Sequence, residues 1–205
     1  MKCKKSIIGI IYTALYFLNL CLSVANTINI DSTKTLNIKE FQNKFTPIIK
    51  LVDDKKYDVA VTECNKIMNS HTQALPGSIE HLYFITCKGL LGAIYYQKKD
   101  FAIAAPILED ATNLYSRETT FVFDNGMIVG LHWQLVYGMN AGESYENIGN
   151  YPKAKALYEK LLPICEAAIT ISPASQQDIL NWRIKELKKR IEKCKTKMQN
   201  QISTK

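Results

Sequence analysis

The chain has 205 residues, a length that suits one globular domain of ordinary size. Hydrophobic residues make up 47% and charged residues 22%, and six prolines and nine glycines are too few for a fibrous or disordered protein. The formal net charge of +7 is unevenly spread, because residues 26–182 are mildly acidic and the segment 183–205 is strongly basic.

The N-terminus has the layout of a secretory signal peptide. Three lysines precede an apolar run over residues 7–18, and the small-x-small triplet Ser23-Val24-Ala25 follows. We therefore expect residues 1–25 to be removed after Ala25, and the mature chain to be exported to a periplasm or to the extracellular space.

The N-terminal segment has two alternatives to cleavage. An uncleaved signal would anchor the chain in a membrane, because the apolar stretch is near spanning length. A lipoprotein modified at Cys21 is disfavoured, because Leu18-Asn19-Leu20 lacks the small residues that such a site needs just before the cysteine.

The rest of the chain is predicted to be almost entirely helical after a flexible lead-in over residues 26–40. Pro47 is expected either to mark a helix start or to kink the helix around it, Pro106 is expected to bend its helix, and Asp100 is a candidate N-cap. The turns are indicated by Pro76-Gly77, Asp124-Asn125-Gly126, Gly149-Asn150 and Ser172-Pro173. The predicted helices cover about 38–54, 57–69, 78–98, 101–115, 127–148, 151–171 and 175–199.

An internal repeat organises these helices. A glycine is followed three residues later by a tyrosine, nine later by an aromatic residue and twelve later by an alanine. A third, weaker copy begins at Tyr57 and lacks the upstream glycine and tyrosine. The two strong copies are Gly92, Tyr95, Phe101, Ala104 and Gly142, Tyr145, Tyr151, Ala154.

The repeated residues have a packing reason. Two antiparallel helices approach closely only where side chains are small, so Gly92 is expected to face Ala104, and Gly142 to face Ala154. The aromatic residues would fill the space around each crossing, and the short links between the helices force the hairpin.

This pattern resembles the tetratricopeptide repeat family, over roughly residues 41–171. The resemblance implies an all-α fold of about three helical hairpins stacked as a solenoid. The repeats begin at Tyr57, Phe101 and Tyr151, which are 44 and 50 residues apart. The family period is about 34 residues, so the curvature of the stack cannot be taken from the family.

The resemblance also implies a binding surface on the first helix of each hairpin. No cationic cluster of the kind that clamps a peptide carboxylate is visible there. Aromatic residues and methionine are enriched in protein interfaces, although such residues can equally belong to the core, which is the reading we favour for most of the Trp133 region. The candidate partner-binding residues are Tyr96, Trp133, Tyr137, Met139 and Glu143.

The final segment, residues 175–202, is predicted to be a basic amphipathic helix that caps the repeats. Its alternatives are a dimer seam, because the apolar spacing is heptad-like, and a basic arm that docks on an anionic membrane surface. Nucleic acid would suit the same charge, but an exported protein rarely meets it. The apolar positions are Leu180, Ile184, Leu187, Ile191, Cys194, Met198 and Ile202.

Four cysteines remain in the mature chain. Cys64 and Cys87 fall at similar heights in neighbouring helices, so a Cys64–Cys87 disulfide is feasible in an oxidising compartment, and two small buried thiols are the alternative. Cys165 and Cys194 lie at unequal distances from their turn and are not expected to pair.

Catalytic and cofactor motifs are absent from the sequence. No histidine stands at metal-ligand spacing beside Cys, Asp or Glu, and no phosphate loop or nucleophile elbow occurs. We therefore expect a non-enzymatic scaffold without metal or cofactor that binds a protein or peptide. The alternative is an assembly component that self-associates or docks on a membrane through its basic helix.

Overall fold

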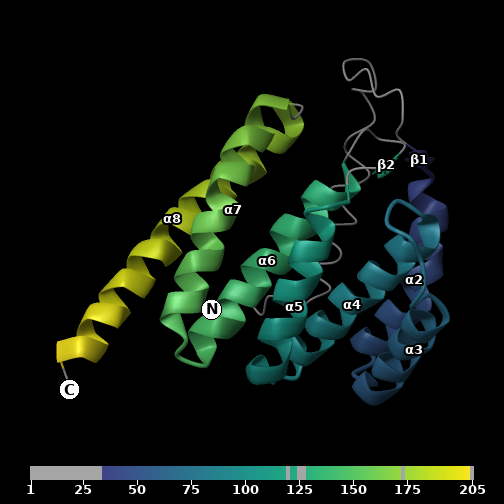
Figure 1. Ribbon diagram of the computed structural model, residues 1–205, viewed down its shortest axis with the longest axis horizontal. Helices are drawn as coiled ribbons and strands as arrows, with labels where there is room; N and C mark the ends of the chain where they lie inside the picture. The colour runs from purple at the N-terminus through teal and green to yellow at the C-terminus, as the bar shows by residue number, and fades with distance from the viewer. Residues whose placement is uncertain (1–33, 119–120, 124–127, 172–173, 204–205) are drawn as a thin grey trace.

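The computed structural model describes residues 34–118, 121–123, 128–171 and 174–203. These residues form an all-α protein with two short strands (Figure 1). The predicted signal peptide and the turns at residues 124–126 and 172–173 lie outside the described residues. The elements are β1 (Lys34–Leu36), α2 (Ile38–Asp53), α3 (Tyr57–Ser70), α4 (Ile79–Gln97), α5 (Phe101–Tyr115), β2 (Phe121–Phe123), α6 (Val129–Asn147), α7 (Tyr151–Ile171) and α8 (Ala174–Ser203).

The predicted helices are confirmed to within a few residues, and their ends follow local chemistry. Asn37 and Ser78 cap α2 and α4, each accepting a hydrogen bond from a backbone N–H three residues later. Asp100 does stand at the N-cap position of α5, but its side chain makes no capping hydrogen bond. Helix α2 runs through Pro47, so the expected start at that residue is wrong.

The lead-in differs from the prediction at its C-terminal end. Residues 34–36 form β1, which pairs in parallel with β2, so this stretch is a strand and not a loose segment. Phe121 of β2 is buried, with 1% of its surface exposed. Strand pairing between segments so far apart in the sequence leaves no local signal, because neither three-residue run is long enough to show alternation.

The helices pack as consecutive antiparallel hairpins. Each helix from α2 to α7 packs on the helix that follows it in the chain. This includes α5 and α6, although β2 separates them in the sequence. The first helices of the second and third hairpins, α4 and α6, also contact each other. In Figure 1 the helices form a row, with α2 and α3 at one end and α8 at the other.

The repeated glycines do lie at helix crossings, but their closest neighbours differ from the expected ones. A Cβ placed on Gly92 would lie 2.7 Å from Leu108 Cγ, and one on Gly142 would lie 2.2 Å from Tyr158 Cε1. Leu108 and Tyr158 each stand seven residues after the aromatic residue of their repeat. The alanines of the pattern, Ala104 and Ala154, are fully buried. The two hairpins therefore use one crossing geometry.

Candidate interaction surface on the first helices

Two of the five candidate partner-binding residues belong to the core. Trp133 and Tyr137 are 7% and 2% exposed, and their rings stack with centroids 5.3 Å apart. Tyr137 also packs on Tyr115 and against the backbone of α4 at Gly89. The candidate role of Trp133 and Tyr137 as direct partner contacts is therefore wrong in this fold, because their aromatic surface is used to join α4, α5 and α6.

The other three candidates lie on α4 and α6, the first helices of the second and third hairpins. Tyr96, Met139 and Glu143 are partly exposed, and the Tyr96 phenol lies beside the Glu143 carboxylate. Burial, reinforced by Glu143, raises the pKa of the Tyr96 phenol well above its usual value. Tyr96 thus stays neutral, and it lies near Glu143 where the end of α4 meets α6.

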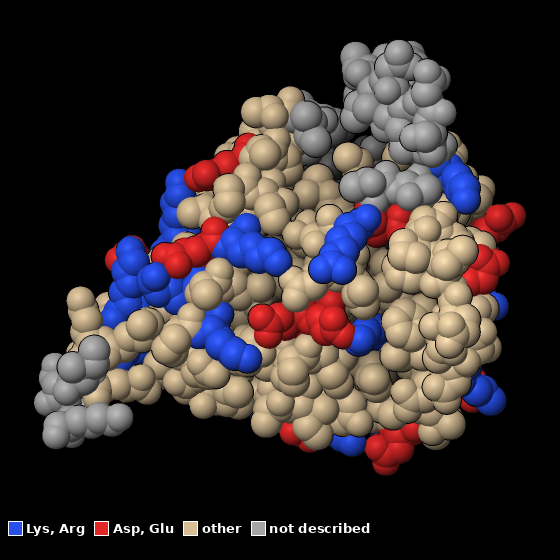
Figure 2. All heavy atoms as spheres, in the orientation of Figure 1, with Lys and Arg blue, Asp and Glu red and all other residues tan. Residues whose placement is uncertain are grey.

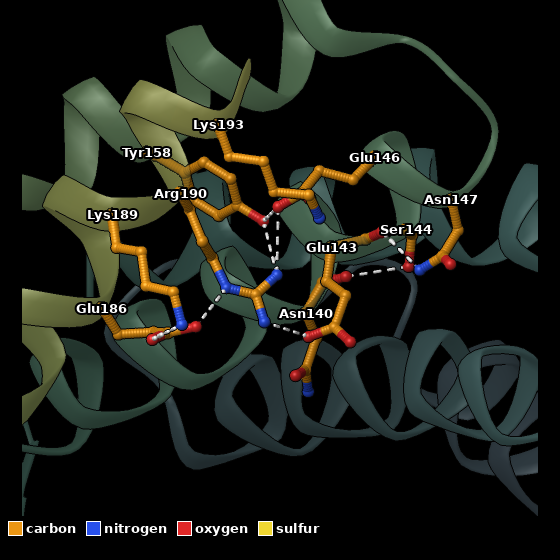
Figure 3. A network of polar contacts seen from close by, with 10 residues as sticks. All are labelled: Asn140, Glu143, Ser144, Glu146, Asn147, Tyr158, Glu186, Lys189, Arg190 and Lys193. Atoms are coloured by element: carbon orange, nitrogen blue, oxygen red, sulfur yellow. Dashed lines mark hydrogen bonds and ion pairs between the residues drawn. The ribbon is translucent and has the colours of Figure 1, made fainter. Parts of the chain in front are cut away.

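Arg190 of α8 is the centre of a charged network that the sequence analysis missed (Figure 3). Its guanidinium contacts Glu143 at 2.9 Å and Glu146 at 3.0 Å in α6, and its own helix supplies Glu186 at 2.9 Å. It also donates to the Tyr158 hydroxyl of α7 at 3.2 Å. The guanidinium fork suits this task, because it can offer separate donors to several oxygens at once.

Glu146 is the most buried member of this network, with 4% of its side chain exposed. Tyr158 donates to it at 2.8 Å, and Lys193 forms an ion pair with it. Burial alone would raise the pKa of this carboxyl group, but the hydrogen bonds from Lys193 and Tyr158 and the charge of Arg190 together hold it below its usual value. Glu146 is therefore a carboxylate at neutral pH.

The basic face of α8 is partly neutralised by these contacts. Besides Arg190 and Lys193, Lys188 pairs with Glu166 of α7 at 3.1 Å. Lys185 and Lys197 are exposed and have no ion pair within the described part of the chain. Figure 2 shows Lys and Arg side chains, with acidic ones between them, over the end of the molecule that α8 forms.

The apolar seam of α8 is buried within the chain. Leu187 and Cys194 are fully buried and Ile191 is 6% exposed, and α8 packs along α7. The seam therefore acts as the predicted cap. Self-association through the same seam would have to compete with α7, and a homodimer stays a prediction.

The two cysteines expected to lie together do so. Cys64 and Cys87 are fully buried free thiols in contact with each other, and their contact and their burial raise the pKa of Cys87. The disulfide itself stays a prediction, which thiol counting in the denatured, exported protein would test. Cys165 and Cys194 are also buried free thiols.

A second buried polar group lies at the start of α6. His132 Nε2 and Trp133 Nε1 are buried and have no hydrogen-bond partner among the residues that the structure describes. Burial and the nearby charge of Arg183 lower the pKa of His132 to about 3. Within the described ranges no group of three or more His, Cys, Asp or Glu residues could hold a metal ion. No helix of the described residues is long and apolar enough to cross a membrane.

The sequence contains a weak signal for the network. Glu143 and Glu146 are spaced i, i+3 on α6, and Glu186 and Arg190 are spaced i, i+4 on α8, so each pair shares a helix face. That the two faces meet depends on how α8 lies across α6 and α7, which no local pattern encodes.

Comparisons with known proteins add no identity. A scan against protein-family models finds no match, and searches of curated proteins and of solved structures find none either.

Proposed function

We propose that this chain is an exported, non-enzymatic scaffold of tetratricopeptide-like hairpins that binds a partner protein or peptide. The observation that carries the proposal is the shared crossing geometry of the second and third hairpins, in which Gly92 and Gly142 let the helices approach closely. Such an array builds an extended, rigid surface, which is the usual binding device of helical repeats.

The surface proposed for binding is the inner side of α4 and α6. Glu143 is held by Arg190 at 2.9 Å and lies beside Tyr96, so it needs little further ordering when a partner arrives. Met139 lies one helical turn before Glu143, and Asn147 is exposed one turn after it. Together they offer apolar, acidic and amide groups along one helix.

Site-specific photo-cross-linking tests this surface in the cell of origin. A photoreactive phenylalanine analogue placed at Asn147 should capture a discrete partner, and Tyr96→Ala should reduce that capture. The matched control is the same analogue at Ala102, an exposed residue of α5. Equal capture from both positions, or no loss with Tyr96→Ala, would count against the inner side as the binding surface.

A second candidate function is docking on an anionic membrane surface through α8. It is favoured by Trp182, which is 51% exposed, and by Lys185 and Lys189 further along the helix. Indole rings and lysines suit the headgroup region of anionic bilayers. The chain should sediment with vesicles that contain about one-third phosphatidylserine. The double variant Lys185→Glu, Lys189→Glu should stay in the supernatant. Retention that ignores this double change would dismiss the candidate.

A further inference from the structure

The first hairpin has an open groove between its two helices. The groove has a volume of about 570 Å³ and is lined only by residues of α2, α3 and the turn between them. Ile48, Leu51 and Ile67 give it an apolar lining, and Val59 at its edge is 50% exposed. No residue of α4 lines it, and at its rim Lys44 Nζ lies 5.4 Å from the centroid of the Tyr83 ring of α4.

The equivalent seam of the third hairpin is filled by a helix. Lys44, Leu51 and Ile67 stand 94 residues before Gly138, Tyr145 and Leu161, the interval that also separates Tyr57 from Tyr151. At the third hairpin α5 covers these positions. Tyr145 donates to Glu109 of α5 at 2.6 Å, and the Thr112 methyl group of α5 lies 3.1 Å from where a Cβ on Gly138 would stand.

The second hairpin is covered in the same way. Helix α3 packs on α4, and Asp58 of α3 accepts from Lys98 at 3.1 Å. In both cases the covering helix is the second helix of the preceding hairpin, and it brings a carboxylate to the hairpin that receives it. The first hairpin has no preceding hairpin among the described residues, and its seam is open.

The charges around the groove favour an acidic occupant. Asp54 is paired with Lys56 at 3.4 Å and Glu63 with Lys66 at 3.1 Å. Lys44 and Lys50 of α2 have no carboxylate partner in the part of the chain that the structure describes. The rim therefore presents uncompensated positive charge to an incoming helix.

We infer that this groove is a docking site for one amphipathic α-helix of a partner protein, with acidic residues beside its apolar stripe. The helix would lie on α2 and α3 as α5 lies on α6 and α7, with its carboxylates near Lys44 and Lys50. This is a helix-in-groove interaction. It is a second surface, separate from Tyr96 and Glu143, and it stands whether or not the inner side binds a partner.

The probe is a fluorescein-labelled peptide with the α5 sequence, residues 101–115, titrated with the full chain and followed by fluorescence anisotropy. A helix this short is marginally stable alone, so a dissociation constant of about 10–100 µM is expected. Val59→Asp should weaken binding about tenfold, because it places a carboxylate at the edge of the groove that receives an acidic helix. The matched control is Ile103→Asp in the full chain, with the peptide unchanged. Ile103 is 42% exposed at the position of the second hairpin that is equivalent to Val59, so this change should leave the affinity for the peptide unchanged.

A charge exchange sharpens the test. Lys44→Glu with Lys50→Glu should weaken the α5 peptide, and a peptide carrying Glu109→Lys and Asp110→Lys should recover binding to that variant. Circular dichroism of each variant checks that the fold is intact. Unsaturable binding, or equal effects of Val59→Asp and Ile103→Asp, would overturn the proposal.

Two other occupants of the groove would give different experimental results. A full-chain dimer that Val59→Asp dissociates would identify a second copy in the groove. Cross-linking of a Val59→Cys chain to its own residues 1–33, with no peptide binding, would identify the leader. Either result overturns a partner helix as the occupant.

Discussion

At the scale of single residues, the side chains that pack on Gly92 and Gly142 differ in how freely they can move. Gly142 faces Tyr158, whose hydroxyl is held by Glu146 and Arg190 and whose ring is fully buried. Gly92 faces Leu108, a side chain without polar contacts. The crossing at Gly142 is therefore the more rigid of the two.

We expect Gly142→Ala to lower the free energy of unfolding by about 1–3 kcal/mol, because the new methyl group overpacks a ring that cannot move. Chemical denaturation measures the change. Gly149→Asn is the control, since Gly149 has φ +76° with open space around it and asparagine tolerates that conformation. A Gly142→Ala protein as stable as the wild type would show that the crossing has room to relax.

We expect His132 to make the free energy of unfolding depend on pH. Its pKa of about 3 in the folded protein lies below its usual value of about 6.5, so only the unfolded chain binds this proton at intermediate pH. Stability should fall as the pH decreases from 6.5 towards 3, by up to about 1.4 kcal/mol per unit. His132→Phe should remove this contribution in urea unfolding at pH 7 and pH 5. An unchanged pH slope in the variant would assign the effect elsewhere.

At the scale of elements, α8 is fixed by two different kinds of contact. Its apolar seam packs along α7, and Arg190 ties it to α6 through Glu143 and Glu146. The apolar contact supplies the burial, and the charged contact fixes where along α6 the helix lies. A buried ion pair is weak evidence of stability by itself, but breaking one side of it is costly.

We expect Arg190→Met to lower the free energy of unfolding by about 3 kcal/mol, because it leaves Glu146 buried with fewer partners. Adding Glu146→Gln should recover part of the loss, which a double-mutant cycle measures. Additive effects of the two changes would mean that they do not interact.

The same network predicts an acid response. The pKa of Glu146 is lowered in the folded protein, so its contribution is present above the unfolded value of about 4.5 and is lost as the pH falls through the folded value. In Arg190→Met the folded pKa of Glu146 should move up towards the unfolded value, so the loss of stability should be smaller and should be complete at a higher pH. Urea titrations of both proteins between pH 6 and pH 3 would show it, and coincident pH profiles would contradict it.

At the scale of the whole molecule, the row of hairpins has unlike ends. The C-terminal end is closed by α8, and the N-terminal hairpin leaves its groove open. The apolar seam of α8 packs against α7. Removal of α8 would therefore expose the apolar face of α7, including Cys165 and Ala168.

We therefore expect the chain over residues 26–205 to be a monomer, and a version ending at residue 175 to aggregate or lose its cooperative transition. Light scattering coupled to gel filtration, with thermal unfolding, distinguishes these states. A dimeric full chain with a folded, monomeric truncation would instead make α8 an association device.

The helices, their order and the hairpins could be predicted from the sequence. Helix periodicity, capping residues such as Ser78 and short turns such as Gly149-Asn150 act within a few residues, so they are readable from the chain. The repeat pattern located the crossings at Gly92 and Gly142 for the same reason, and the positions of Cys64 and Cys87 on either side of their turn placed them at similar heights.

Which side chains remain at the surface depends on how the helices pack and could not be predicted from the sequence. Trp133 and Tyr137 look like interface residues by type, but the contact between α4 and α6 buries them. Arg190 looks like a solvated charge on a basic helix, but it is shared by three carboxylates from two helices. The pairing of β1 with β2 and the open groove of the first hairpin also depend on how distant segments pack. Burial and charge pairing are properties of that packing, so residue type alone cannot supply them.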